Sequence, residues 1–381
     1  MKITLQNTPE QAELIKAMAS KNRDVAYEAQ TALAEFIGPV LAEVVNTAPT
    51  VSNMFTSLQF NSDESPSIPL DLYHDITDED YIQVWSQSVP GGLPTNQVAP
   101  SQSELKFTTY TLDSALSFDK RYASRSRLDV VSKTFTRMAQ EILLKQEKTS
   151  ASMIMTALAK AKTGSNDEQH VMRSAQAGRF LLSDLNKLFT KAKRINTSWT
   201  GGTPADRRGR GITDILVSPE IVEEIRGLAY NPINTIGGAG GVPTAGDGIA
   251  GTDTMRDAIF NSAGIPEFYG VSIQEYNEMG VGQKWNDVFQ LAATAESYDD
   301  NYSVDGAGEV TIQSDEQILV GVDLSRESMI RAVATDSESG DEFSLVSDDQ
   351  FVTRQSKIGY YGSLEEGRMI IDDRVLLGLI V

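Results

Sequence analysis

The sequence predicts an α+β chain with more than one domain. Helical and strand patterns occupy separate stretches: the first 50 residues and a long central block are helical, and the last third holds mainly short strands. The 381 residues exceed the usual size of a single domain. With 40% hydrophobic and 23% charged residues, most of the chain has enough apolar side chains for a buried core.

Residues 1–50 are predicted to form an N-terminal helical arm. Thr8-Pro9-Glu10-Gln11 is a capping box with proline at the first helical position, so a helix should begin here and run to about Ser20. A second helix is expected from about Arg23 to Ile37. Gly38-Pro39 should end it, because proline removes a helical hydrogen bond and glycine costs backbone entropy.

Residues 51–119 are predicted to form an extended loop built on a long β-hairpin. Strands are expected at 67–72, 81–85 and 105–112. The polar, Gly- and Pro-containing stretch at about 86–103 fits the hairpin tip. A hairpin of this length has too little core to be stable alone. It therefore needs another surface to lie on, and in a self-assembling protein that surface belongs to a neighbouring copy.

Residues 120–211 are predicted to form a separate domain around one long helix. The apolar residues Leu128, Val131, Phe135, Met138 and Ile142 follow one another at steps of 3, 4, 3 and 4. We expect this helix at about 127–163, and at 1.5 Å per residue it would be roughly 50 Å long. A second amphipathic helix is expected at about 183–194.

Residues 212–349 are predicted to form an α/β domain with a strand-rich part. Ile212–Glu220 is typical of a strand that runs into a helix, with Ser218 as N-cap and Pro219 in the first turn, and this helix should continue to about residue 228. A further helix is expected at 254–263. The expected strands are 271–276, 288–292, 310–313, 317–324 and 329–335, followed by C-terminal strands within 350–381 at 350–359, 368–371 and 375–381.

The composition excludes several classes of site. Cysteine is absent, which excludes disulfides, thiolate metal ligands and cysteine nucleophiles. His74 and His170 are the only histidines, too few for a zinc site built on several histidines, and we interpret each as a solvated loop residue. No apolar run reaches 18 residues, so we expect no membrane span. The N-terminus also lacks the apolar core of a signal peptide.

Three short motifs suggest a ligand but fit simpler interpretations better. Residues 237–241 are glycine-rich but lack the Gly-Lys-Ser/Thr ending of a phosphate-binding loop. Residues 299–306 have the glycine at the wrong offset for a calcium loop. The acidic residues between Asp71 and Asp80 fit an exposed turn. We therefore expect no catalytic, cofactor or metal site, and no enzymatic activity.

The net charge of -20 is unevenly distributed along the chain. Residues 24–104 hold twelve acidic residues and no Lys or Arg, whereas residues 120–210 hold 19 basic and 7 acidic residues. The simplest interpretation is two solvated faces of opposite sign. The alternative is that the acidic segment of one copy lies on the basic segment of the next, since complementary patches set register and partner choice. The candidate contact residues are Asp78, Asp80, Trp85, Pro90 and Leu93 on the acidic side and Arg121, Arg125, Arg127 and Arg137 on the basic side.

Three segments carry a family resemblance: residues 214–226, 265–273 and 318–324. With them, and in its order of elements, the chain over about residues 40–381 resembles the major capsid proteins of tailed bacteriophages, which share the Hong Kong 97 fold. The resemblance implies an N-terminal arm, an extended β-hairpin loop, a peripheral domain with a long spine helix, and an axial α/β domain.

The resemblance also implies a function and partners. Such a chain would assemble with itself into hexamers and pentamers of an icosahedral shell, with a scaffold protein, a portal and in some cases a decoration protein. The shell would enclose double-stranded DNA without reading its sequence, in a virion assembled in the host bacterial cytoplasm. Two alternatives stay open: the shell protein of an encapsulin-like nanocompartment, which has the same fold, and another virion protein such as a tail-tube or decoration subunit.

Overall fold

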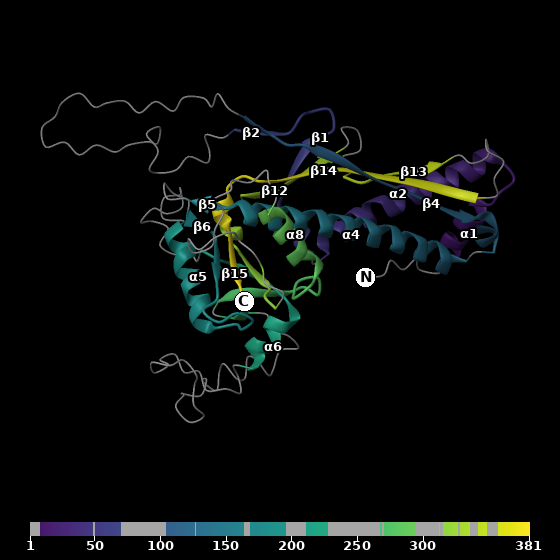
Figure 1. The fold of residues 1–381 in the computed structure, drawn as a ribbon. Helices are drawn as coiled ribbons and strands as arrows, with labels where there is room; N and C mark the ends of the chain where they lie inside the picture. The colour runs from purple at the N-terminus through teal and green to yellow at the C-terminus, as the bar shows by residue number, and fades with distance from the viewer. Residues whose placement is uncertain are drawn as a thin grey trace, which may run out of the picture. The chain divides into compact units, whose positions relative to one another are not determined.

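The computed structural model describes residues 8–48, 50–69, 104–125, 127–163, 168–195, 211–227, 267–268, 270–294, 312, 315–326, 328–335, 342–348 and 357–381. It divides into two compact units, each assembled from three separate stretches of chain (Figure 1). Unit 1 comprises Met1–Ile68, Glu104–Ser150 and Met329–Met369. Unit 2 comprises Pro69–Ser103, Ala151–Ser328 and Ile370–Val381. Helices and several sheets are both present, which confirms the α+β class.

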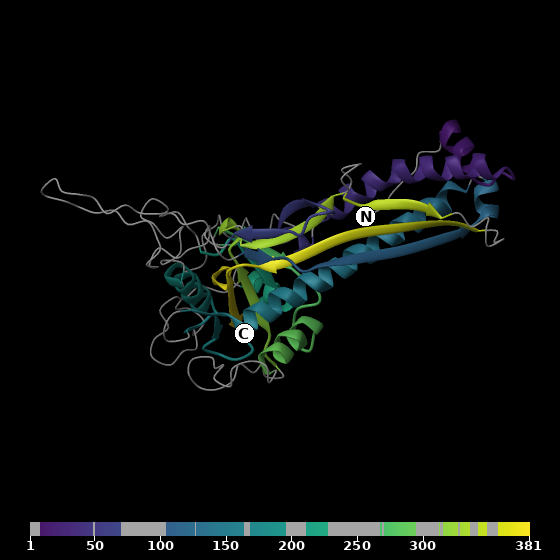
Figure 2. The same ribbon diagram turned by 90° about the horizontal axis from the view of Figure 1, so that it is seen from above.

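Unit 1 is built on a five-stranded sheet. Its order is β1 (Thr56–Asn61), β12 (Met329–Thr335), β14 (Lys357–Ile370) and β13 (Ser344–Asp348), and β4 (Thr109–Asp119) also pairs with β14. β4 and β14 run antiparallel side by side from Thr109↔Gly367 to Asp119↔Lys357 (Figure 2). The short strands β2 (Ser67–Pro69) and β3 (Glu104–Lys106) pair with each other. The expected strand at 81–85 and hairpin tip at 86–103 lie outside the described residues.

The helices of unit 1 begin largely where the sequence predicts. They are α1 (Pro9–Met18), α2 (Arg23–Thr47), the 3-10 helix η1 (Val51–Met54), α3 (Lys120–Ser124) and α4 (Leu128–Lys160). The Thr8 side chain accepts a hydrogen bond from the backbone N–H of Gln11, so the predicted cap of α1 is confirmed. The predicted long helix is also confirmed, since α4 has 33 residues, of which those after Ser150 fall in unit 2.

The predicted end of the second helix at Gly38-Pro39 is wrong, because α2 continues through Pro39 to Thr47. Beyond the proline, Leu41 and Val45 are buried in the same core as Ile37. Burial of these two side chains offsets the hydrogen bond that Pro39 removes. Tertiary packing therefore overrides the local helix-breaking signal.

The core of unit 1 lies between the sheet and helices α1, α2 and α4. At its centre the ring of Phe135 from α4 meets the ring of Tyr360 from β14 edge-on, with centroids 5.4 Å apart. Both side chains are buried. Gly362 allows close approach of helix and strand, because a Cβ there would lie 2.1 Å from the end of the Met138 side chain.

Unit 2 contains a six-stranded sheet in the order β7 (Val171–Arg173), β15 (Leu376–Ile380), β11 (Ile318–Val322), β8 (Asp214–Val217), β10 (Val271–Glu275) and β9 (Glu267–Phe268). Every residue of β11 and β15 is buried, and their sequences are correspondingly continuous apolar runs. Helices α5 (Leu182–Ile195) and α6 (Pro219–Gly227) share a core with this sheet. The remaining elements are β5 (Lys162–Thr163), β6 (Glu168–Gln169), α8 (Lys284–Thr294), η5 (Leu324–Arg326) and η6 (Asp373–Val375).

Sequence and structure agree on the strand-to-helix passage of unit 2. Ser218 lies between β8 and α6, and its hydroxyl accepts a hydrogen bond from the backbone N–H of Ile221. The strand expected at 288–292 is wrong, since these residues belong to α8. Its buried residues Trp285, Phe289, Ala292 and Ala293 recur at helical spacing. The helix expected at 254–263 lies outside the described residues.

The C-terminal strands differ from the prediction in length. The segments 350–359 and 368–371 were expected as separate strands, but Lys357–Ile370 forms the single 14-residue strand β14, and 350–356 lie outside the described residues. Charged residues such as Glu366 and Arg368 interrupt the apolar pattern of this segment although both are buried. The strand continues through these charges because Glu366 and Arg368 pair with each other inside the protein.

The Phe135–Tyr360 contact predicts the effect of a core truncation. Phe135→Ala should lower the free energy of unfolding of unit 1 by about 3–5 kcal/mol, because it removes a buried ring and leaves a cavity. Urea unfolding followed by circular dichroism, under conditions where the chain is monomeric, measures this. Leu144→Ala on the exposed side of the same helix is the control and should change stability by about 0.5 kcal/mol or less. Equal effects of the two changes would contradict the assigned core.

Candidate assembly surfaces

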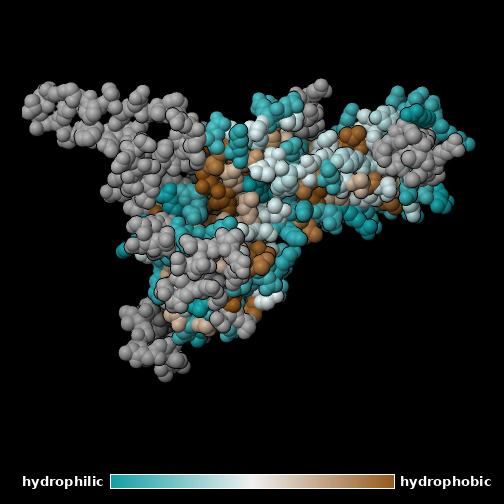
Figure 3. Space-filling view, turned by 45° about the horizontal axis from the view of Figure 1, so that its top comes forward, coloured by the Kyte–Doolittle hydropathy of each residue, from teal (hydrophilic) through white to brown (hydrophobic). Residues whose placement is uncertain are grey.

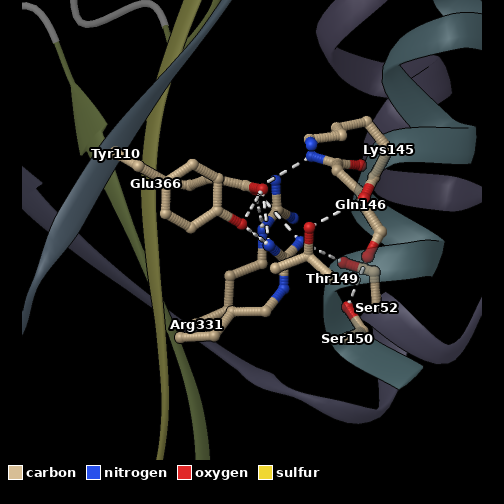
Figure 4. A network of polar contacts seen from close by, with 9 residues as sticks. Ser52, Tyr110, Lys145, Gln146, Thr149, Ser150, Arg331 and Glu366 are labelled. Carbon is tan, nitrogen blue, oxygen red and sulfur yellow. Dashed lines mark hydrogen bonds and ion pairs between the residues drawn. The ribbon is translucent and has the colours of Figure 1, made fainter. Parts of the chain in front are cut away.

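A buried charge cluster joins five distant segments of unit 1 (Figure 4). Its centre is the Glu366 carboxylate on β14, whose side chain has no exposed surface. One oxygen accepts hydrogen bonds from the Tyr110 hydroxyl of β4 at 2.8 Å and from Arg368. The other accepts from Gln146 of α4 at 2.9 Å and from Arg331 of β12 at 3.0 Å.

Arg368 extends this cluster to the fifth segment. Its guanidinium donates a 2.7 Å hydrogen bond to the hydroxyl of Ser52, in η1, as well as contacting Glu366 and Tyr110. The next backbone N–H along η1, that of Val51, donates to the Glu147 carboxylate of α4 at 2.9 Å. The cluster thus links strands β4, β12 and β14, helix α4 and η1 at one place.

Two guanidinium groups hold the Glu366 carboxyl ionised. Burial alone would raise its pKa, but the charges of Arg368 and Arg331 and the hydrogen bonds of Arg368 and Tyr110 outweigh burial and lower it. Burial and the Glu366 charge raise the pKa of the Tyr110 hydroxyl to about 12, so Tyr110 remains a neutral donor. With no solvent-facing surface, this carboxylate cannot reach a substrate. Its effect is to fix the register between the sheet of unit 1 and helix α4.

The cluster is not predicted from the sequence, although the sequence holds one signal of it. Arg331 is the single charged residue in the buried strand Met329–Thr335. A charge in such a strand requires a buried partner of opposite sign. Glu366 and Arg368 are two residues apart in a strand and so face the same side. Pairing them with Arg331 needs knowledge of which strands are adjacent.

His170 is a structural residue, and its interpretation as solvated is wrong. The side chain is fully buried in unit 2, and its Nδ1 lies 3.1 Å from the carbonyl oxygen of Asp373 and 3.0 Å from that of Leu376. Burial lowers its pKa, against the opposing charge of Asp373. Because carbonyl oxygens only accept hydrogen bonds, Nδ1–H is the donor to them. His170 therefore ties the β6–β7 region to the C-terminal strand. His74 lies outside the described residues.

Among the described residues, no group of three or more acidic or histidine side chains is placed to hold a metal ion. The acidic turn at 71–80, the segment 299–306 and the glycine-rich segment 237–241 lie outside these residues. Across the same described part of the chain, no helix has the length and apolar character needed to cross a membrane.

Four of the nine predicted contact residues are described, and all four are exposed: Arg121, Arg125, Arg127 and Arg137. Arg121 forms a 3.1 Å ion pair with Asp119, and Arg127 lies 4.0 Å from Asp129, so both have partners within the chain. Their role between copies stays a prediction. The other five, Asp78, Asp80, Trp85, Pro90 and Leu93, lie outside the described residues.

Exposed apolar side chains lie on the sheet of unit 1. Val346 of β13 pairs with Tyr361 of β14, which pairs with Ala115 of β4, so the three form one row across the strands. Val346 is 52% exposed and Tyr361 is 42% exposed, and both line a shallow hollow. Brown hydrophobic patches also interrupt the teal surface in Figure 3. Such patches are typical of surfaces that bind other proteins.

No protein-family model matches the sequence, and no curated protein matches it. Several solved structures are similar in backbone. A chain of the mature capsid of bacteriophage PhiM1 is 10% identical, with 87% of this chain and 86% of that chain covered and a TM-score of 0.47. A chain of the capsid of Cyanophage P-SCSP1u is 12% identical, with 86% of each covered and a TM-score of 0.45.

The SrpI encapsulin complex from Synechococcus elongatus PCC 7942 is also similar, at 10% identity, with 73% of this chain and 75% of that chain covered and a TM-score of 0.36. All three TM-scores lie below 0.5. The likeness is therefore a partial one of backbone.

The buried cluster predicts a large effect of removing its carboxylate. Glu366→Ala should lower the free energy of unfolding of unit 1 by about 3–5 kcal/mol, since two buried guanidinium groups lose their counter-charge. Urea unfolding of the monomer measures this loss. Glu365→Ala, one residue earlier on the opposite side of the strand, is the matched control and should cost about 0.5 kcal/mol. Similar losses for both variants would show that the cluster is not a stabilising centre.

The lowered pKa of Glu366 predicts a pH dependence. The unfolded state, with a pKa near 4.5, binds a proton more readily than the folded state. The stability from this group is therefore fully present above that pH and is lost as the pH falls through the folded-state pKa. Unfolding free energy measured from pH 7 downward should decline more steeply in the wild type than in Glu366→Gln. Parallel pH curves would contradict the assigned ionisation.

Proposed function

We propose that this chain is a structural subunit of a closed protein shell, and specifically the major capsid protein of a tailed double-stranded DNA phage. It would form hexamers and pentamers of an icosahedral shell, assembled with a scaffold protein and a portal in the host bacterial cytoplasm, and in some cases bound by a decoration protein. In this proposal the chain catalyses no reaction.

One observation carries the proposal. In unit 1, a charge cluster that is closed to solvent joins α4 to the long antiparallel strand pair β4–β14. At 1.5 Å per residue α4 is about 50 Å long, and at about 3.3 Å per residue the 14-residue strand β14 is about 46 Å long. Long, rigid elements with exposed apolar side chains suit a subunit that meets many neighbours along its length.

The charge of the chain agrees with a DNA container. A net charge of -20 disfavours adhesion to phosphates, since nucleic-acid binding needs clustered cations. The inner wall of a capsid has to hold packed DNA without binding it tightly. An encapsulin-like compartment would have the same fold but enclose enzymes, so the cargo distinguishes these two functions.

The proposal predicts closed particles that contain DNA. Particles isolated from phage-producing cells should appear as closed shells by negative-stain electron microscopy and should yield nuclease-protected double-stranded DNA. Purified chain should give capsomer rings or shells by light scattering at low salt. Closed shells holding enzyme and no DNA would favour the encapsulin-like function, and tubes or stacked rings would favour a tail protein. A chain of 41.5 kDa that stays monomeric in every condition, with its scaffold added, would contradict the proposal.

A further inference from the structure

Helices α1 and α2 form an apolar groove with an acidic rim. We define this arm groove by its lining residues Leu14, Ala32, Leu33 and Phe36, with Glu10 beside them. Phe36 is 56% exposed, which is unusual for a ring of this size. An exposed ring that lines an apolar groove makes the groove a candidate binding surface.

The exposed side of α2 continues the groove as an apolar stripe. Val25, Ala32, Phe36 and Val40 are all exposed and follow at spacings of 7, 4 and 4, which places them on one side of the helix. Glu28 and Glu35 are exposed and adjoin this stripe. The helix holds four acidic residues and a single basic one, Arg23, so the rim of the groove is negatively charged.

Within unit 1, helix α4 carries an exposed surface of the opposite charge, in which basic side chains surround an apolar one. Lys133, Arg137, Leu144 and Lys148 are exposed and follow at spacings of 4, 7 and 4, and Lys145 is exposed next to them. Leu144 is 57% exposed, and Glu141 is the single exposed acidic residue between Lys133 and Lys148, since Glu147 is half-buried and accepts a hydrogen bond from Val51. We call these residues the α4 face. Within the described part of the chain, none of its four cations forms an ion pair.

We propose that the α4 face of one copy binds in the arm groove of the next copy. Leu144 would lie against Phe36, and the four cations would lie opposite Glu10, Glu28 and Glu35. This inference rests on the proposed function and names the pair of surfaces through which copies meet. The sequence predicts only that the acidic segment 24–104 of one copy lies on the basic segment 120–210 of the next, and the inference assigns this contact to two defined helical surfaces.

The two faces match in length as well as in charge. Val25 to Val40 and Lys133 to Lys148 each span 15 residues, so each stripe is about 22 Å long. A shorter partner would leave part of the apolar stripe exposed. A partner of like charge would be repelled. Electrostatic complementarity of this kind steers encounter and fixes register.

One copy cannot satisfy both faces itself. The opposite sides of α1, α2 and α4 are already packed in the unit 1 core, where Leu33 and Ile37 of α2 meet the cluster that also holds Val131 and Phe135 of α4. Leu33 forms the floor of the arm groove, whereas Ala32 and Phe36 of the groove and the residues of the α4 face are exposed. Because groove and face are different surfaces, the contact is head-to-tail, and repetition with a closing rotation gives a ring.

Paired charge reversals test this contact. The groove variant carries Glu28→Lys with Glu35→Lys, and the face variant carries Lys133→Glu with Arg137→Glu. At a concentration where wild-type chain forms capsomers by mass photometry, each variant alone should show at least a tenfold lower oligomer fraction, because like charges then face each other. Mixed at equal amounts the two should restore rings, since reversed groove meets reversed face and the other contact is wild-type.

Substitutions of two exposed leucines provide a second test and its control. Leu144→Asp should reduce assembly as the face variant does, whereas Leu291→Asp, which alters a 71% exposed leucine of α8 in unit 2, should assemble like the wild type. Circular dichroism confirms that each variant is folded.

The outcomes separate this inference from the proposed function. Variants that assemble as well as the wild type overturn the contact while leaving the shell function intact. Folded variants that fail alone and also fail when mixed overturn it too, because a contact between copies must be rescued by mixing. A wild-type chain that never assembles, even with its scaffold, contradicts the proposed function, and the inference falls with it.

Discussion

The carboxylate of Glu366 is the point on which unit 1 depends. Arg331 and Arg368 are buried with one anion between them, and neither could remain there without it. The two arginines come from β12 and β14, and Glu366 also accepts hydrogen bonds from Tyr110 of β4 and Gln146 of α4, so the ion cluster defines how the sheet lies on α4. Apolar packing alone tolerates small slips, whereas a buried ion cluster has one satisfactory geometry.

This constraint has a consequence for the surface. Once the register of helix and sheet is fixed, the exposed side of α4 is fixed as well, and Leu144 and Arg137 are displayed at set positions. The arm helices are held in turn by the same core, which places Phe36 and its acidic neighbours. A shell built from many weak contacts needs such rigidity, because each contact repeats throughout the lattice.

Local features of the fold were predictable from sequence, and long-range features were not. The cap at Thr8, the apolar spacing of α4 and the Ser218 entry to α6 each depend on residues within a few positions. The passage of α2 through Pro39 depends on core contacts made elsewhere in the chain. The Glu366 cluster joins residues more than 200 positions apart, so no sequence window contains it. The candidate cations, including Arg137, were found because a charge excess is visible without a fold.

A cryo-electron microscopy reconstruction of the assembled particle would test the central claim most directly. The account predicts a closed icosahedral shell of this chain around DNA, in which Leu144 of one copy contacts the α1–α2 groove of its neighbour. An open tube or helical array, or a closed shell whose neighbouring copies leave both surfaces in solvent, would contradict it.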